Sequence, residues 1–369
     1  MNIFYIGFEN IDYSGRSIEL IKVLSSIGTV YGIVLGTKRR DVDSHLKVIN
    51  PDISYLKFIS KAKKEYKNNK KNIDCLFVDN RKAALVAWLL KKQIKNKRII
   101  YDMRELRIPS EIKKISSKLG CIPERRIIAL SDLVICANED RAQFVMQNYK
   151  VKRVTSFENI RMVCDYNLDN LSLYQEKYYH IFGKNSFKFI STSGTSLSRG
   201  NDKLVEAVSL VTSRPVDVLL VGGEFGERGS NETIKAICGK KGLNNVHLIE
   251  MVKSDELRYL IDNSDCGVVN YHSKDTNNKY CASGKIYEFV FANKPVVTTS
   301  NPPLKRFVEK YGIGCSGENY SDLINDMLAN YEKYEENVKR LAPSLSVEKN
   351  NMELANTIKE TILDSRIKE

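Results

Sequence analysis

The feature that most constrains the fold of this chain is a regular alternation between short apolar runs rich in β-branched residues and longer amphipathic stretches with a helical period. The alternation fills the first half of the chain and restarts in the second half. Parallel strands need a crossover connection, and a helix is the usual one, so the pattern favours parallel α/β sheets. We predict an α/β protein with two Rossmann-like, doubly wound domains that face each other across a cleft.

The expected elements follow these two rounds of alternation. The expected strands are Ile3–Ile6, Tyr31–Leu35, Cys75–Val78, Arg98–Tyr101, Leu133–Ala137, Val151–Ser156, Phe187–Ser191, Val216–Val221, Val246–Leu248, Cys266–Val269 and Pro295–Thr298. The expected helices include Ser17–Ser26, Lys82–Lys95, Asp140–Asn148, Asp202–Val211, Asn231–Lys241, Ser254–Asn263, Lys285–Ala292, Asn301–Glu309, 321–339 and 347–365.

The length of 369 residues also favours two domains over one. The stretch from Arg161 to Asn185 is rich in Tyr, Asn and Asp and lacks a clean period, and we place the crossing between the domains there. The predicted domains are residues 1–165 and 166–350, and a final helix occupies 351–369.

The composition excludes several other classes of protein. No stretch approaches the roughly 18 uncharged apolar residues of a membrane-spanning helix, and the N-terminal residues predict a first strand rather than a signal peptide. The eight cysteines form no C-x-x-C pair, and the four histidines lack the spacing of metal ligands. We expect buried thiols in a reducing, cytoplasmic compartment, no metal site and no cofactor.

Positive charge is concentrated in the first half of the chain. Residues 1–165 hold 32 Lys and Arg against 18 Asp and Glu, a net charge of +14, whereas residues 166–369 hold 26 against 27, a net charge of −1. An anionic bilayer attracts such a surface by about 1 kcal/mol for each basic residue close to it. We expect the first half to dock on the inner face of a membrane; solvated helix faces are the alternative. No nucleic-acid-binding pattern accompanies the charge, so we expect no nucleic acid partner.

The run from Ser283 to Val297 is the most informative about function. It begins with small residues and Lys285, continues as a short apolar helix that carries Glu288, and ends in a β-branched strand. Unpaired backbone N–H groups and the helix dipole make a loop that leads into a helix a site for anions. Glu288, one turn into the helix, is placed to accept hydrogen bonds from ribose hydroxyls. The run therefore predicts a nucleoside-diphosphate pocket; a capped helix with an incidental acid is the alternative.

Three other loops of the second half follow predicted strands. The loop from Ser191 to Lys203 contains Gly194 and Arg199, whose guanidinium would bind a phosphate, but it matches neither a Walker A nor a dinucleotide motif. Gly223 permits a close approach of a ligand to the backbone, and the backbone near Val252 is placed to contact a base edge. A polar capping loop, a tight turn and a helix N-cap are the respective alternatives.

The first half contains two candidate loops as well. Gly15 lies between the first strand and the first helix, where it could approach a diphosphate from the opposite wall of the cleft. Asp102, Arg104 and Glu105 follow the strand that begins at Arg98, and polar groups at such strand ends are the ones that meet ligands. The Asp41–Asp43 segment formally matches a D-x-D metal motif, but it lies in a basic loop without a supporting strand, and we do not assign it a metal.

Taken in order, the second-half loops resemble those of the GT-B glycosyltransferases, in particular the retaining group called glycosyltransferase family four. The resemblance spans nearly the whole chain, and its specific part is residues 187–300. The motifs that carry it are Gly194 with Ser198-Arg199-Gly200 and Leu204-Val205-Glu206-Ala207, Leu219-Leu220-Val221-Gly222-Gly223, Glu256-Leu257 with Ser264-Asp265-Cys266, and Gly284-Lys285-Ile286-Tyr287-Glu288-Phe289 with Asn293-Lys294-Pro295-Val296-Val297.

The resemblance implies a nucleotide-sugar domain in the second half, an acceptor-binding domain in the first, and a final helix that packs back toward the first. The predicted donor-binding residues are Gly15, Gly194, Arg199, Gly223, Val252, Ser283, Gly284, Lys285 and Glu288. The predicted catalytic residues are Arg199, Lys285, Asp102, Arg104 and Glu105. The sequence departs from the family at Tyr280, where an acid is usual, and at Thr195, where a basic residue is usual.

The implied activity is the transfer of a sugar from a nucleoside-diphosphate-sugar to an acceptor hydroxyl with retained configuration and without a metal. The basic first half suggests a lipid-linked or glycan acceptor in surface polysaccharide assembly, handled by a peripheral membrane protein. Two alternatives remain open. One is a catalytically silent GT-B protein that binds nucleotide or a partner, which the missing acid at Tyr280 favours. The other is a nucleotide-sugar epimerase, which would need further acids and a histidine in the cleft.

Overall fold

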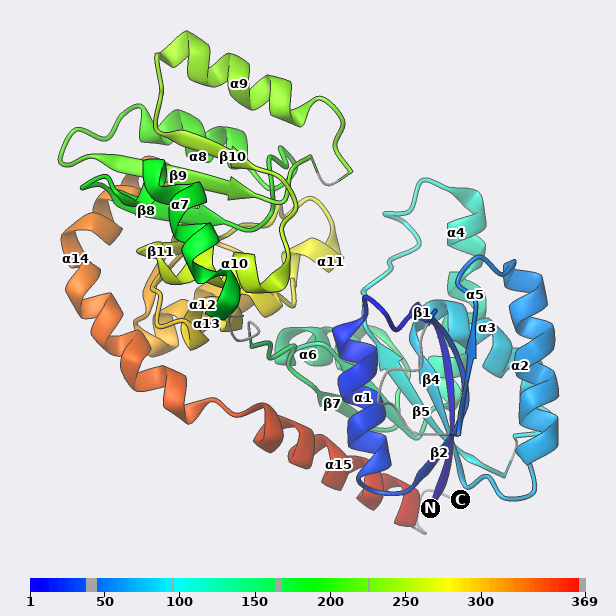
Figure 1. Ribbon diagram of the computed structural model, residues 1–369. Coiled ribbons are helices and arrows are strands. Elements are labelled where there is room, and N and C mark those ends of the chain that lie inside the picture. The colour runs from blue at the N-terminus through cyan, green and yellow to red at the C-terminus, as the bar shows by residue number, and fades with distance from the viewer. Residues whose placement is uncertain (38–44, 95, 163–167, 225, 365–369) are drawn as a thin grey trace. The chain divides into compact units, whose positions relative to one another are not determined.

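The computed structural model describes residues 1–37, 45–94, 96–162, 168–224 and 226–364 (Figure 1). Its contacts divide the chain into two units. The first consists of Met1–Asn159 and Val347–Glu369, and the second of Ile160–Ser346. The Asp41–Asp43 segment lies outside the described residues.

The described residues of the first unit form a parallel sheet of seven strands in the order β3-β2-β1-β4-β5-β6-β7. The strands are β1 (Asn2–Asn10), β2 (Thr29–Leu35), β3 (Leu46–Ile49), β4 (Cys75–Asp79), β5 (Arg98–Met103), β6 (Leu133–Cys136) and β7 (Val154–Ser156). The helices are α1 (Gly15–Ser25), α2 (Tyr55–Asn69), α3 (Asn80–Leu90), α4 (Ile115–Leu119), α5 (Cys121–Leu130), α6 (Glu139–Asn148) and α15 (Val347–Leu363).

The described residues of the second unit form a parallel sheet of six strands in the order β10-β9-β8-β11-β12-β13. The strands are β8 (Phe187–Ser191), β9 (Val216–Val221), β10 (Val246–Ile249), β11 (Cys266–Val269), β12 (Val296–Thr299) and β13 (Gly314–Gly317). The helices are α7 (Leu171–Phe182), α8 (Asn201–Val208), α9 (Ser230–Lys241), α10 (Ser254–Asp262), α11 (Thr276–Lys279), α12 (Gly284–Phe291), α13 (Pro302–Tyr311) and α14 (Tyr320–Leu341). Two α/β units with parallel sheets confirm the predicted fold class.

The central strands of both sheets are buried on both faces. Every residue of β4, β8 and β9 is buried, as expected for parallel strands that helices cover on each side. Alternate residues of a strand serve opposite faces, so Leu219 belongs to one core of the second unit and Leu220 to the other. The continuous apolar runs that predict these strands are therefore a direct consequence of their position in the sheet.

The predicted strands are present, but the prediction did not include two strands, β3 and β13, or the helices α2, α5 and α7. The missed strands, β3 and β13, both lie at sheet edges, and β13 has the sequence Gly-Cys-Ser-Gly, which lacks the usual strand formers. Helix α2 is the Lys- and Asn-rich segment, and it is held by Phe58, Ala62 and Tyr66 at four-residue intervals. The predicted helix Lys82–Lys95 is shorter than expected, since α3 ends at Leu90.

Helix α7 lies within the stretch in which we placed the domain crossing. Its buried residues are Tyr174, Tyr178 and Ile181, a helical spacing, and all three join a core of the second unit. The contacts place the boundary at Asn159, six residues before the sequence-based boundary at 165. The aromatic residues that obscured the period are thus the ones that pack the helix.

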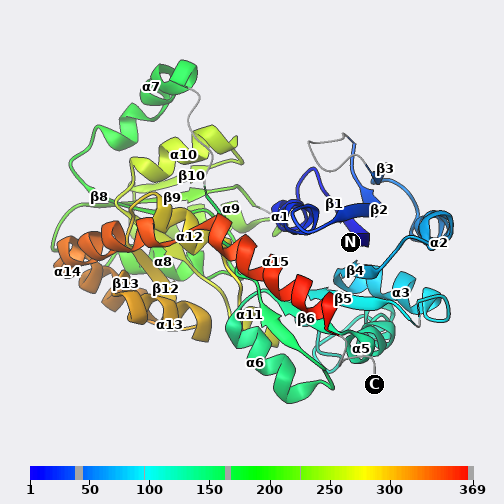
Figure 2. The same cartoon turned by 90° about the horizontal axis from the view of Figure 1, so that it is seen from below.

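Helix α15 belongs to the first unit, although it follows the second unit in the chain. Leu354, Ala355 and Ile358 are buried in the same core as residues of α1, and the two helices lie next to each other in Figure 1 and Figure 2. Arg153 and Glu360 form an ion pair of 3.1 Å at the surface. The unit boundary falls at Val347, four residues before the predicted start of the final segment.

Candidate functional site

Loops that follow β8, β9 and β11 meet the start of α12 at one edge of the second sheet. Because the strands are parallel, their carboxyl ends share that edge, where ligands of such sheets bind. Of the predicted donor residues, Gly194 and Gly223 lie in backbone contact, and Arg199, Lys285 and Glu288 interact electrostatically. The structure thus brings Arg199 and Glu288 close to Lys285 at the N-terminus of α12.

Lys285 lies in the first turn of α12, and its side chain is partly buried. The Nζ atom donates a hydrogen bond to the Thr192 carbonyl at 2.6 Å. Burial, followed by the charges of Arg199 and Arg161, lowers the pKa of Lys285 to about 8, and only Glu288 acts in the opposite direction. A cation at a helix N-terminus is also unfavourable to the dipole, and the first turn of α12 carries no acidic residue. This helix start is suited to a bound anion.

Glu288 lies one turn after Lys285 and is also partly buried. Burial raises the pKa of its carboxyl group, whereas Arg161 and Lys285 lower it. Burial outweighs the two cations, so the net shift of the pKa is upward. The ionised carboxylate accepts hydrogen bonds and does not donate them. That is the form needed to hold a pair of hydroxyl groups.

Arg199 is held in place by the loop that follows β11. Its guanidinium carbon lies 3.7 Å from the centroid of the Tyr271 ring, and Nη1 donates to the Asn270 carbonyl at 3.3 Å. Stacking on an aromatic ring fixes the plane of the guanidinium and leaves its edge available for a phosphate. Sequence reasoning missed Asn270 and Tyr271, although they directly follow a predicted strand.

A network of amides and hydroxyls fixes the loop that carries Arg199. Asn201 donates to the Gly194 carbonyl at 2.7 Å and accepts from Asn270 at 2.8 Å. Ser193 donates to the Asn270 side chain at 3.1 Å, so the loops that follow the neighbouring strands β8 and β11 are joined. Because Asn201 and Asn270 are buried and paired, the loop geometry is set before any ligand arrives.

Gly194 and Gly223 are required by close contacts with neighbouring strand-end loops. Gly194 has a φ of +60°, and a Cβ atom there would lie 2.0 Å from the Gly223 carbonyl oxygen. A Cβ atom at Gly223, whose φ is +62°, would lie 2.5 Å from Oε2 of Glu250. Val252, two residues later, packs against a core of the second unit. The structure therefore explains why glycine occupies both positions, whether or not a ligand binds there.

Two buried hydroxyls near Lys285 have no hydrogen-bond partner among the described residues. They are Oγ of Ser283, the residue before α12, and Oγ1 of Thr192, whose carbonyl binds Lys285. Ser283 does not cap the helix with its side chain. A buried hydroxyl without a hydrogen-bond partner costs free energy. A ligand at the start of α12 would supply the missing partner for these two hydroxyls.

The first-half candidates Asp102 and Arg104 belong to a buried charge network. Arg16 binds Asp102 with two nitrogens, at 2.7 and 3.1 Å, and the Asp102 side chain is fully buried. Arg104 binds both oxygens of Asp79 at 2.9 and 3.1 Å and also donates to Ser17 at 2.8 Å. The sequence analysis did not identify Arg16 as the partner of Asp102 or Asp79 as the partner of Arg104. Each partner neutralises the charge of the predicted residue.

The remaining first-half candidates lie apart from that network. Glu105 pairs with Arg107 at the surface, where Nε donates to Oε2 at 2.8 Å. Gly15 is exposed, and a Cβ atom there would meet no atom within 4 Å. The structure therefore gives Gly15 open space and Glu105 a local partner.

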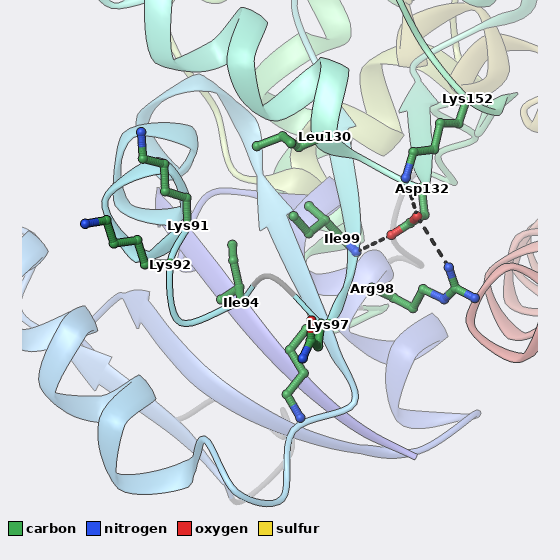
Figure 3. A pocket seen from close by; sticks show the side chains of 10 residues that line it. Lys91, Lys92, Ile94, Lys97, Arg98, Ile99, Leu130, Asp132 and Lys152 are labelled. Atoms are coloured by element: carbon green, nitrogen blue, oxygen red, sulfur yellow. Dashed lines mark hydrogen bonds and ion pairs between the residues drawn. The ribbon is translucent and has the colours of Figure 1, made fainter. Parts of the chain in front are cut away.

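A cavity of about 750 Å³ opens at the other end of the first sheet, at the start of β5 and β6 (Figure 3). Lys91, Lys92 and Lys97 lie on its rim, near the points where α3 and α5 end. Its buried carboxylate, Asp132, accepts from Lys152 and from the Ile99 backbone, both at 2.9 Å. Lysines at helix C-termini stabilise the dipole, so this basic hollow has a structural explanation.

No known protein-family model matches the sequence, and no curated protein matches it. Solved structures do match over nearly the whole chain. A sucrose-phosphate synthase from Thermosynechococcus elongatus has 14% identity and a TM-score of 0.72, with 98% of each chain covered. Anabaena HepE, solved in complex with UDP, has 17% identity and a TM-score of 0.73, with 98% of this chain and 100% of that chain covered. This chain has the GT-B fold.

The structure of WaaG, a glycosyltransferase involved in lipopolysaccharide biosynthesis, also matches this chain. It has 13% identity and a TM-score of 0.66, with 97% of this chain and 99% of that chain covered. At such identities the likeness concerns the fold, and the function rests on the residues of the site. Within the described ranges, no helix combines the length and the apolar composition that a bilayer crossing requires.

Proposed function

We propose that this GT-B protein is a glycosyltransferase that moves a sugar from a nucleoside-diphosphate-sugar to an acceptor hydroxyl with retained configuration. The observation that carries the proposal is the partly buried Lys285 at the start of α12, with Arg199 beside it and Glu288 one turn away. A diphosphate supplies the negative charge that this arrangement lacks, and a ribose supplies hydroxyls for the carboxylate. The complexes of HepE with UDP and with UDP-glucose support this class of donor.

The proposed reaction needs stabilisation of a departing diphosphate. The bond between the anomeric carbon and the phosphate oxygen breaks, and the acceptor oxygen bonds to the same carbon. The acceptor proton passes to a phosphate oxygen of the leaving group. Arg199, Lys285 and the amides of α12 place positive charge where negative charge develops, and fixed charges of this kind contribute several kcal/mol. No metal is needed in this scheme.

The proposal is tested with a panel of UDP-, GDP- and dTDP-sugars. We expect one donor to bind and to be hydrolysed slowly in the absence of an acceptor, because water replaces the acceptor hydroxyl. Calorimetry measures binding, and release of the nucleoside diphosphate measures hydrolysis. Absence of binding by every donor would contradict the proposal.

A catalytically silent GT-B protein is the second candidate, and Tyr280 is the observation that favours it. This residue follows α11 at the position where an acid is expected, and the nearby Asp275 uses its carboxylate to cap α11 through the Asn278 backbone at 2.9 Å. Binding of a donor without turnover in the panel would favour this candidate over the transferase.

We further propose that the first unit docks on an anionic membrane and receives a lipid-linked acceptor there. The support is the α4 patch, defined as Ile115, Leu119 and Ile122, whose exposed fractions are 74%, 58% and 54%. Exposed basic residues surround the patch, namely Lys113, Lys114, Lys118, Arg125 and Arg126. Apolar side chains flanked by lysine and arginine are suited to the interface of an anionic bilayer.

Replacing all three patch residues with serine is expected to lower the affinity for anionic vesicles by about tenfold or more, because the apolar insertion is lost. Flotation with phosphatidylglycerol-containing vesicles measures this at low and high salt. The matched control is Leu173→Ser with Met251→Ser, which removes exposed apolar residues from the second unit. Equal flotation of the patch variant and the wild type would contradict the assignment of the patch.

A further inference from the structure

Arg161 lies just after the boundary between the two units, on the segment that leads into the second. Ile160 packs against a core of that unit, so the segment is anchored next to the site. A Cβ atom on Gly284 would lie 2.7 Å from Cδ and 3.0 Å from Nε of Arg161. The arginine side chain therefore crosses the first residue of α12 in the space that the glycine leaves open.

This position brings a third cation to the start of α12. Arg161 interacts electrostatically with both Lys285 and Glu288, and Arg199 acts on Lys285 from the other loop. Three cations thus converge with one carboxylate on a helix terminus that is itself positive. Arg199 and Arg161 both disfavour the protonated form of Lys285, and a bound anion with several charges would offset this effect.

We propose that Arg161 is a direct ligand of the donor diphosphate, and that Gly284 is needed to let its side chain reach the helix start. The inference rests on the proposed function and extends it to a residue of the connecting segment. Arg161 is exposed at the start of the second unit, where a ligand can reach it. Its planar edge then offers two parallel N–H donors to phosphate oxygens.

Arg161→Ala tests the proposal, with calorimetry on the purified full chain. The probes are UDP, GDP and dTDP, of which the tightest is used, and the corresponding monophosphate. We expect the affinity for the diphosphate to fall about 10- to 100-fold, the effect of losing a hydrogen bond to a charged group. The affinity for the monophosphate is expected to fall much less, because Arg161 is assigned to the diphosphate.

A pH series supplies a readout that a purely structural role would not change. Lys285 titrates at a pKa of about 8, and the charged groups that face it are Arg199, Arg161 and Glu288. Only the protonated amine attracts an anion, so the affinity of the wild type should fall as the pH rises above about 8. Without Arg161 the amine keeps its proton to a higher pH, and the decline should move to higher pH. In Arg161→Lys, which keeps the charge, the decline should stay near its wild-type position.

The control is Arg214→Ala, which removes the same charge from a residue just before β9. That residue lies at the amino ends of the strands, whereas the candidate site lies at their carboxyl ends. Wild-type diphosphate affinity in Arg161→Ala, or equal losses for both nucleotides with no shift in the pH series, would overturn the role of Arg161. If no nucleoside diphosphate binds the wild type, or if Arg199→Ala leaves binding unchanged, the proposed function itself fails. The two failures are therefore distinguishable.

Discussion

Lys285→Met is expected to lower the rate of sugar transfer by about 100- to 1000-fold, the usual effect of removing one donor that stabilises developing charge. Methionine keeps the apolar stem in its buried site and removes only the amine. The hydrogen bond to the Thr192 carbonyl is lost as well, at a cost of about 1 kcal/mol. The rate is measured with the donor identified by the nucleotide-sugar panel.

The pH dependence of the rate strengthens this experiment. Burial lowers the pKa of Lys285 to about 8, so the wild-type rate at low donor concentration should decline as the pH rises past that value. The variant should lack this decline, since it has no group to lose a proton there. Lys305→Ala, on the exposed face of α13, is the matched control and should retain the wild-type rate. A variant that transfers sugar as fast as the wild type would remove Lys285 from the mechanism.

Asp102→Ala is expected to destabilise the first unit by about 3–5 kcal/mol, because it leaves the charge of Arg16 buried without its partner. Both side chains are almost completely buried, and Arg16 also donates to the Phe157 carbonyl at 2.8 Å. Trp88 in α3 is the single tryptophan of the chain, so its fluorescence during urea unfolding reports on the first unit alone. A second transition from the other unit does not disturb this signal.

Two further variants separate a structural role of Asp102 from a catalytic one. Adding Arg16→Met to Asp102→Ala should restore much of the stability, because both charges are then absent. Glu105→Ala removes an exposed carboxylate and should change the free energy of unfolding by no more than about 1 kcal/mol. If Asp102→Ala unfolds at the wild-type urea concentration but loses sugar transfer, the residue acts on the substrate instead.

The sequence predicted the fold class and the helical spacing of Lys285 and Glu288 because both depend on local patterns. Lys285 and Glu288 are one helical turn apart, so their relation follows from the helix alone. Arg199 follows a strand that could be recognised from its apolar run. The edge strand β13 was missed because four small residues carry no such pattern.

The partners of the charged residues could not be predicted in the same way. Arg16 and Asp102 are 86 positions apart in the chain, and Arg104 meets Asp79 only because β4 and β5 are neighbours in the sheet. Asp102 and Arg104 were predicted as catalytic from their place at a strand end. Their contacts indicate that both residues also stabilise the first unit, a role that no local sequence pattern predicts.

The sequence by itself determined where most strands and helices lie and which strand ends carry polar loops, because periodicity and capping act over a few residues. The tertiary structure decided which of those polar groups meet. Strand order paired Arg104 with Asp79, and a side chain missing at Gly284 gave Arg161 its path to α12. The physical reason is that charges interact through space, so their partners depend on sheet order and close packing rather than on distance along the chain.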